Sequence, residues 1–132
     1  MYFLDTNICI FIINGKYPNL NKRFLECDKK AIKISSVVLY ELFYGAEKSQ
    51  KRTHNIAKIQ TFISELEIIP FDRKTAEIAS VVRADLEKTG QPIGGYDLMI
   101  ASTAIANNGI IVTNNTREFS RINKLSVEDW SV

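Results

Sequence analysis

The sequence of 132 residues predicts an α/β fold, a three-layer α/β/α sandwich with a mainly parallel sheet. Short β-branched runs alternate with helical patterns along the chain, and this alternation implies crossover connections between parallel strands. No repeat, low-complexity tract or linker interrupts the pattern, so we expect one domain over residues 1–132. The hydrophobic fraction of 45% and the charged fraction of 24% are those of an ordinary globular protein.

Hydrophobic periodicity and capping residues predict the individual elements. A first strand at residues 2–4 leads into a helix that Thr6 or Asn7 caps and that ends at Gly15. Pro18 begins a second helix, because proline is tolerated in the first turn. The remaining predicted elements are a strand at 31–35, a helix at 37–49 capped by Ser35 or Ser36, a helix at 53–65, a strand at 67–71, helices at 74–88 and 96–108, and a strand at 110–113.

Composition excludes several classes of protein. The net charge of +2 and the pI near 8.5 permit an anionic partner but do not identify one. His54 is the single histidine, and Cys9 and Cys27 form no CxxC pair, which argues against a Cys/His zinc site. The two cysteines fit reduced core thiols of a cytoplasmic protein. The apolar start of the chain lacks a basic region and is too short to span a bilayer, so we expect neither a signal peptide nor a membrane anchor.

The first candidate site residue is Asp5, a carboxylate at the end of an apolar segment that predicts a buried strand. An unpaired buried carboxylate costs several kcal/mol, so it requires a partner, a proton or a metal. In open parallel sheets, ligands bind outside the carboxyl ends of the strands. Asp5 ends the first strand and Thr113 ends the last one, so both point to that crevice. The structural alternative is that Asp5 only caps the following helix.

Two further acids lie on the apolar stripes of predicted helices. Glu41 follows Val37 by four residues and Val38 by three, spacings that place it on the face toward the sheet. Asp97 shares a face with Ile100 and lies in the first turn of its helix, where free amides favour an anion. In isolation, Glu41 fits a buried acid paired with a base, and Asp97 fits an N-terminal capping residue.

These acids come from separated parts of the chain and converge on one predicted crevice. No Lys or Arg lies within one turn of Glu41 or Asp97 to neutralise them. Clustered carboxylates repel one another, and their pKa values rise unless a cation compensates. A hard divalent ion, Mg²⁺ or Mn²⁺, suits several oxygen ligands without His or Cys. The chemistry that follows is metal-assisted hydrolysis of a phosphodiester.

Four sequence blocks carry a resemblance to a known family. They are "LDTN" at residues 4–7, "YELFYGA" at 40–46, "GQPIGGYDLMIASTA" at 90–104 and "VTNNTREFSRI" at 112–122. Their order and spacing resemble the PIN-domain family and, more narrowly, its VapC toxins of bacterial toxin–antitoxin pairs. With "EDW" at 128–130, the resemblance covers essentially the whole chain.

The resemblance implies a Mg²⁺- or Mn²⁺-dependent endoribonuclease whose family acids carry over onto Asp5, Glu41 and Asp97. It implies a VapB-type antitoxin whose C-terminal segment occupies the active-site groove, a homodimer, and toxin–antitoxin complexes that bind operator DNA through the antitoxin. VapC toxins with the block "TNNTREF" are associated with cleavage in the anticodon stem-loop of initiator tRNA.

The fourth acidic position departs from the broad family pattern. Many PIN domains have an acid two residues after the Thr that ends this strand, where this chain has Asn115. Glu118 is the nearest acid and is expected to act indirectly, with the Asn115 carbonyl as an additional oxygen ligand; the alternative is a solvated acid on a short helix. The polar residues beside the acids are candidate accessory groups: Thr6, Asn7, Thr113, Asn114 and Asn115.

Basic and aromatic residues beside the predicted site are candidates for RNA contacts. Arg117, Arg121 and Lys124 follow the last predicted strand and are placed to hold phosphates that flank the scissile one. Aromatic residues adjoin two of the acids and fit base stacking, although the core or a dimer contact are the commoner roles. These aromatic residues are Tyr40, Tyr44 and Tyr96.

Two rival functions come from other classes of protein. A receiver-type phosphoacceptor domain requires paired acids after the first strand, an Asp after a middle strand and a Lys after a later one. Here the strand at 31–35 ends in serine and the strand at 110–113 leads into asparagines, which fits poorly. A catalytically silent PIN scaffold is the second rival, and the presence of Asp5, Glu41 and Asp97 argues against it.

Overall fold

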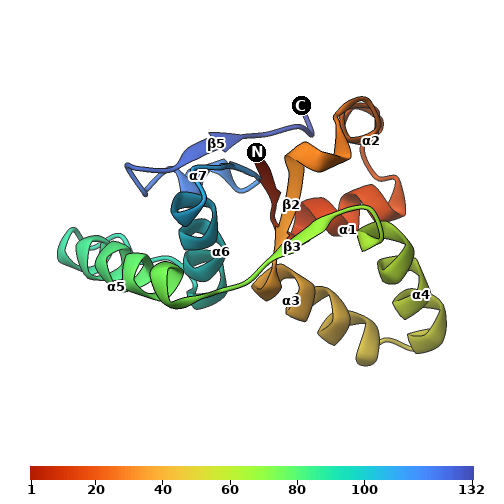
Figure 1. Cartoon of the computed structure of the whole chain (residues 1–132), viewed down its shortest axis with the longest axis horizontal. Helices are drawn as coiled ribbons and strands as arrows, with labels where there is room; N and C mark the ends of the chain where they lie inside the picture. Colours follow the sequence, from red (N-terminus) through yellow and green to blue (C-terminus); the bar gives the residue numbers. More distant parts are fainter.

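The computed structural model describes residues 1–132 as an open five-stranded sheet with helices on both faces (Figure 1). The strand order is β3-β2-β1-β4-β5, and every neighbouring pair is parallel. The strands are β1 (Tyr2–Leu4), β2 (Ile32–Ser35), β3 (Glu67–Ile69), β4 (Ile110–Val112) and β5 (Ser126–Glu128).

The helices form the two outer layers. In Figure 1, α1, α2, α3 and α4 lie on one side of the sheet, whereas α5, α6 and α7 lie on the other. This arrangement confirms the predicted α/β/α sandwich. The helices are α1 (Thr6–Asn14), α2 (Pro18–Glu26), α3 (Ser36–Glu47), α4 (Arg52–Ile63), α5 (Arg73–Lys88), α6 (Gly95–Ala106) and α7 (Thr116–Phe119), with a 3-10 turn η1 (Lys29–Ala31) before β2.

The capping residues explain where the first helices begin and end. Asp5, rather than Thr6 or Asn7, is the N-cap of α1, because its Oδ1 accepts a hydrogen bond of 2.9 Å from Ile8 N. Gly15 ends α1 in the left-handed region at φ +65°, a conformation that glycine adopts without steric cost. The prediction of Thr6 or Asn7 as the cap was therefore wrong.

The turn into α3 is held by two serines with different roles. Ser35 Oγ caps α3 by accepting a hydrogen bond of 3.1 Å from Val38 N. Ser36 Oγ instead accepts a hydrogen bond of 3.1 Å from Phe71 N, which ties the end of β2 to the segment that follows β3. The predicted pair of serines is therefore present, with the capping role assigned to Ser35.

The strand β5 and the turn η1 were not predicted from the sequence. β5 is an edge strand of three residues that pairs with β4, with Ile110 opposite Ser126 and Val112 opposite Glu128. Its residues are exposed or only partly buried, so its sequence carries no clear alternation of apolar and polar positions. The segment therefore forms a strand because it pairs with β4, and its local sequence pattern does not indicate one.

The core lies on both faces of the central strand β1. Phe3 and Leu4 are completely enclosed, and the ring of Phe3 packs against the chain at Gly109, where an added Cβ would approach the ring to 2.5 Å. Cys9 is buried, Cys27 is partly buried, and both are free thiols, as expected. No helix has the length and apolar character that crossing a membrane requires.

The sheet order brings the carboxyl ends of β1 and β4 side by side, where open parallel sheets form a crevice. From β1 the chain continues to β2 on one side, whereas β4 lies on the other side of β1. Ligands of open α/β sheets bind at such a point, where the direction of the strand order changes. Asp5 follows β1 directly, its amide donates to Val112 O (3.1 Å), and Thr113 follows β4.

Candidate active site

Four acidic side chains from four separate elements reach the crevice. Asp5 follows β1, Glu41 lies on α3, Asp97 lies in the first turn of α6, and Glu118 lies on the short helix α7. The charges of Glu118, Asp5 and Glu41 all raise the pKa of Asp97, so the four carboxylates are within electrostatic reach of one another. The structure thus places all four acids that the sequence singled out around one site.

Asp5 is the most deeply buried of these acids, with 5% of its surface exposed. Burial is the largest cause that raises the pKa of Asp5, and the charges of Glu41 and Asp129 raise it further. Hydrogen bonds from the Thr113 side chain and from the Ile8 amide lower the pKa and partly offset burial. Asp5 is therefore a helix cap that also carries an uncompensated negative charge.

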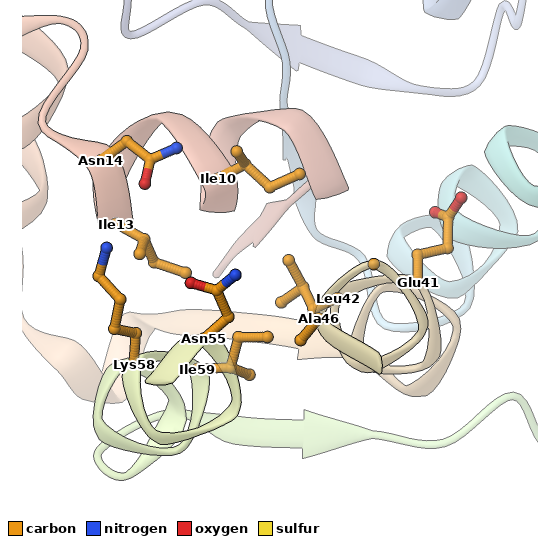
Figure 2. Close-up of a pocket in the computed structure, with 10 residues that line it drawn as sticks. Ile10, Ile13, Asn14, Glu41, Leu42, Ala46, Asn55, Lys58 and Ile59 are labelled. Carbon is orange, nitrogen blue, oxygen red and sulfur yellow. The ribbon is translucent and has the colours of Figure 1, made fainter. Parts of the chain in front are cut away.

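Glu41 faces the crevice rather than the sheet. The buried face of α3 consists of Val37, Val38, Leu42 and Ala46, and Glu41 is partly exposed at its edge. The prediction that Glu41 faces the sheet was therefore wrong. The carboxylate is held by the Thr6 hydroxyl, which donates a hydrogen bond of 2.5 Å to Glu41 Oε1. Figure 2 shows the Glu41 side chain on the side of α3 that is turned toward α6.

Asp97 has the most strongly perturbed pKa among the four acids. Burial is the main cause, followed by the charges of Glu118, Asp5 and Glu41, and together they raise the pKa from 3.8 to about 6. The side chain is only partly buried, so it faces the crevice, and the buried face of α6 is formed by Leu98 and its apolar neighbours. Asp97 is thus a partly solvent-accessible carboxylate that three neighbouring carboxylates repel.

Glu118 is anchored by two hydrogen bonds from the protein. Its Oε1 accepts from Gly94 N (3.0 Å) and its Oε2 accepts from Asn115 Nδ2 (2.9 Å). These hydrogen bonds, the backbone one first, hold the pKa of Glu118 below its usual value. Gly94 precedes α6, and a Cβ added there would lie 3.8 Å from Asp97 Oδ2 and 3.9 Å from Glu118 Oε1. Glu118 therefore connects α7 to the start of the helix that carries Asp97.

The candidate accessory residues divide into two groups. Thr6 and Thr113 contact acids directly, and Asn115 holds Glu118 while its amide donates to Thr113 Oγ1 (2.9 Å). Asn7 and Asn114 are exposed, and their side chains donate and accept no hydrogen bond within the chain.

The basic residues that were predicted to bind RNA also differ among themselves. Arg117 and Lys124 are exposed on the surface beyond β4 and form no ion pair. Arg121 is partly buried, and its Nη1 donates to Pro92 O (2.8 Å), so it fixes the segment that leads into α6. Arg121 therefore has a structural contact in addition to its predicted role.

Asp129 is a site neighbour that the sequence reasoning missed. It follows the edge strand β5, and its charge contributes to the raised pKa of Asp5. Its Oδ1 accepts hydrogen bonds from the Ser131 amide (2.8 Å) and hydroxyl (2.6 Å), which fix the turn after β5. The only signal in the sequence was the "EDW" block. Because strand β5 was not predicted, the sequence did not show that Asp129 lies near Asp5.

The four acids form a donor set that fits a hard divalent cation. None of the ion pairs of the chain involves them, although the charge of Arg121 contributes to the lowered pKa of Glu118. No three acidic, His or Cys side chains are grouped closely enough to constitute a formed metal centre, and three of the four acids accept hydrogen bonds from the protein. Oxygen-only ligands with excess negative charge are what Mg²⁺ and Mn²⁺ prefer.

Comparisons with known proteins identify the family of the chain. The PIN domain family model matches residues 2–125. The chain is 46% identical over 130 residues to the tRNA(fMet)-specific endonuclease VapC of Shigella flexneri, with 98% of both chains covered. It is also similar to chains of two solved VapBC structures. The match to the DNA-bound VapBC from Salmonella typhimurium has 43% identity and a TM-score of 0.93, and it covers 98% of this chain and 97% of that chain. The match to VapBC2 from Rickettsia felis, bound to a DNA fragment from the promoter, has 45% identity and a TM-score of 0.90, and it covers 98% of both chains.

PIN-domain ribonucleases generally depend on a divalent metal ion, which is compatible with the clustered carboxylates of this crevice. The family match spans nearly the whole chain, and the similarity to VapC extends over sequence and fold alike. The chain therefore belongs to the PIN-domain family, among its VapC ribonucleases.

Proposed function

We propose that this protein is the toxin of a type II toxin–antitoxin pair and a Mg²⁺- or Mn²⁺-dependent endoribonuclease that acts in the cytoplasm. The observation that carries the proposal is the convergence of Asp97 with three other carboxylates, none of which forms an ion pair. Burial and these charges raise the pKa of Asp97 to about 6. Clustered negative charges destabilise the protein alone, and a bound cation that neutralises them removes this repulsion. The relatives named ribonuclease and endonuclease VapC support the same reading.

Asp5 and Asp97 are the proposed direct ligands, with Glu41 beside them and Glu118 in a supporting role. A bound divalent ion would supply a positive charge that activates water and stabilises charge on the scissile phosphate. The chain's own residues set the geometry: Thr6 orients Glu41, and Thr113 and the Ile8 amide orient Asp5. Glu118 holds the start of α6 through the amide of Gly94.

The proposed substrate is RNA, with the anticodon stem-loop of initiator tRNA as the specific target. The name of the Shigella flexneri relative, tRNA(fMet)-specific endonuclease, supports this target. Arg117, Arg121 and Lys124 are the proposed contacts for the flanking phosphates, because Arg117 lies on α7 with Glu118 and the other two follow that helix.

A groove beside Glu41 is the proposed binding site for an antitoxin segment (Figure 2). The groove lies between α1, α3 and α4 and has a volume of about 240 Å³. Ile10, which is 38% exposed, lines the groove, and Lys58 provides a charged group at the end away from Glu41. A peptide that buries apolar side chains here would reach the catalytic acids. The VapBC assemblies solved with DNA support an antitoxin partner and operator binding through it.

The receiver-type alternative does not match the observed sheet. Its flavodoxin-like strand order is 2-1-3-4-5, whereas this chain has the order 3-2-1-4-5. The silent-scaffold alternative predicts no dependence of RNA cleavage on a divalent metal. A titration of purified protein with Mn²⁺ and Mg²⁺, with EDTA as the control, distinguishes a scaffold from an enzyme.

Induction in cells tests the toxin assignment. Expression alone should arrest growth, and co-expression of the adjacent antitoxin gene should relieve the arrest. Sequencing of RNA 5′ ends after brief induction should show one dominant cut in the initiator tRNA. Asp97→Asn is the matched control and should remove both the arrest and the cut. Normal growth with folded wild-type protein would contradict the assignment.

A further inference from the structure

Three tyrosines form an exposed aromatic cluster beside the acids. Tyr40 and Tyr44 lie one turn apart on α3, and Tyr96 lies at the start of α6. Their surfaces are 52%, 55% and 49% exposed, respectively. The rings of Tyr40 and Tyr44 are nearly parallel, at 15° and 6.3 Å between centroids, and Tyr96 meets Tyr40 edge-on at 5.7 Å. The core role that such residues commonly have is therefore ruled out by exposure.

The cluster is adjacent to the proposed catalytic acids in sequence and in space. Tyr40 directly precedes Glu41, and Tyr96 directly precedes Asp97. The pKa of Tyr40 is raised mainly by the side chain of Tyr96, and the charge of Glu41 also contributes. The cluster therefore borders the part of the crevice that holds Glu41 and Asp97.

A positive charge lies at the outer end of the cluster. Lys48 Nζ is 4.9 Å from the centroid of the Tyr44 ring, and Lys48 forms no ion pair. Half-exposed aromatic rings with an ammonium group over one of them match the two components of a nucleotide, a flat base and a phosphate.

The exposed area of the three tyrosines also helps to identify what binds to the cluster. A half-exposed tyrosine offers on the order of 100 Å², so the three rings offer about 300 Å². A stable interface between two protein chains needs roughly 800 Å² from each partner. The cluster by itself is thus too small for a dimer interface, whereas it suffices for one or two unpaired bases.

We propose that Tyr40, Tyr44 and Tyr96 form a stacking platform for unpaired nucleobases of the RNA substrate, with Lys48 binding an adjacent phosphate. This inference rests on the proposed ribonuclease function and specifies how that site holds its substrate. Single-stranded RNA is recognised through base stacking on aromatic side chains, which tolerates different bases because every base has a flat face. The platform would select looped RNA over duplex RNA at the catalytic acids.

The test compares aromatic and aliphatic replacements on the intact protein. Tyr44→Leu and Tyr40→Leu remove the ring but keep an apolar side chain, whereas Tyr44→Phe and Tyr40→Phe keep the ring. The substrate is an RNA stem-loop with 2-aminopurine in the loop, because the fluorescence of this base is quenched when it stacks. An RNA duplex without a loop is the second substrate, and thermal melts verify folding of each variant.

We expect Tyr44→Leu and Tyr40→Leu to raise the KM for the stem-loop about fivefold to a hundredfold, the range for loss of one stacked base. The kcat should change little, the quenching should fall, and the Phe variants should match the wild type. Binding is measured in the Asp5→Asn background to avoid cleavage. Lys48→Ala should lower the salt dependence of binding by about one phosphate contact, whereas Lys22→Ala on the distant α2 should not.

Unchanged KM and quenching in the Leu variants would overturn the platform while metal-dependent cleavage by the wild type still stood. Loss of self-association in the Leu variants without loss of RNA affinity, measured by light scattering, would also overturn it and assign the cluster to contact with a second copy. Absence of any RNA cleavage by the folded wild type would instead remove the proposed function together with this inference.

Discussion

Thr6 and Glu41 are joined by a hydrogen bond of 2.5 Å from the Thr6 hydroxyl to Glu41 Oε1. The bond links the first turn of α1 to the middle of α3, although the two residues are 35 positions apart. It holds one oxygen of a partly exposed carboxylate at the edge of the crevice. A hydroxyl at position 6 is therefore expected to serve the active site rather than helix capping, which Asp5 performs.

Thr6→Val keeps the shape of the side chain and removes the donor, so Glu41 should lose its orientation. We expect the free energy of unfolding to fall by about 1 kcal/mol, the usual contribution of one such hydrogen bond. The concentration of Mn²⁺ needed for half-maximal RNA cleavage should rise. Thr6→Ser, which retains the hydroxyl, is the matched control, and equal metal requirements for all three proteins would contradict this role.

Asp5→Asn should abolish RNA cleavage without destabilising the fold. Asparagine caps helices as well as aspartate does, so the bond from Ile8 N is retained while one repelling charge is removed. Asp5→Ala should also be inactive but should lose about 1 kcal/mol of stability, because the cap disappears. Cleavage assays and urea unfolding of both variants separate the two roles. A less stable but still active Asp5→Asn protein would refute a metal-binding role.

Asp97 should make the metal-free protein less stable as the pH rises from about 4 to 6. Its pKa is raised from 3.8 to about 6, so the folded state holds the proton more tightly than the unfolded state in this interval. The free energy of unfolding is highest below pH 3.8, falls as the pH rises to about 6, and stays at its reduced level at higher pH. Asp97→Asn should lack this decline and should be more stable than the wild type at pH 7 in EDTA.

The same pair of proteins should differ in how strongly a divalent ion stabilises them. Mn²⁺ should raise the melting temperature of the wild type at pH 7, because binding to the folded state stabilises it. The Asp97→Asn variant should gain much less. Urea unfolding in EDTA across the pH range, together with melts in Mn²⁺, measures both effects. An equal gain from Mn²⁺ in both proteins would place the ion elsewhere.

Glu118→Gln should reduce RNA cleavage less than Asp5→Asn does. Glu118 is occupied by the amide of Gly94 and the side chain of Asn115, which indicates a supporting role at the start of α6. Glutamine retains one acceptor oxygen for Gly94 N, whereas Glu118→Ala retains none. Hydrogen exchange at residues 94–98 should therefore quicken in the Ala variant and change little in the Gln variant. Complete loss of cleavage in Glu118→Gln with unchanged exchange would instead indicate direct participation.

The sequence alone was sufficient to predict the fold class and to single out acids that the structure brings to one end of the sheet. The alternation of β-branched runs with helical patterns, and the caps around them, are local features that reflect short-range steric and hydrogen-bonding preferences. Asp5, Glu41 and Asp97 stood out because each interrupts an apolar pattern without a basic residue nearby. A charged residue within an apolar run of the sequence is recognisable without the tertiary structure, although the structure shows Glu41 at the edge of the apolar face rather than on it.

Only the tertiary structure decided how these residues act together. The order β3-β2-β1-β4-β5 depends on long-range packing, because short strands carry similar local patterns whichever neighbours they take. That order sets β4 against β1, and the edge strand β5 brings Asp129 toward Asp5. The bond from Thr6 to Glu41 joins helices that no sequence spacing connects. The pKa of Asp97 likewise depends on burial and on three distant carboxylates, and desolvation and Coulomb repulsion act through space rather than along the chain.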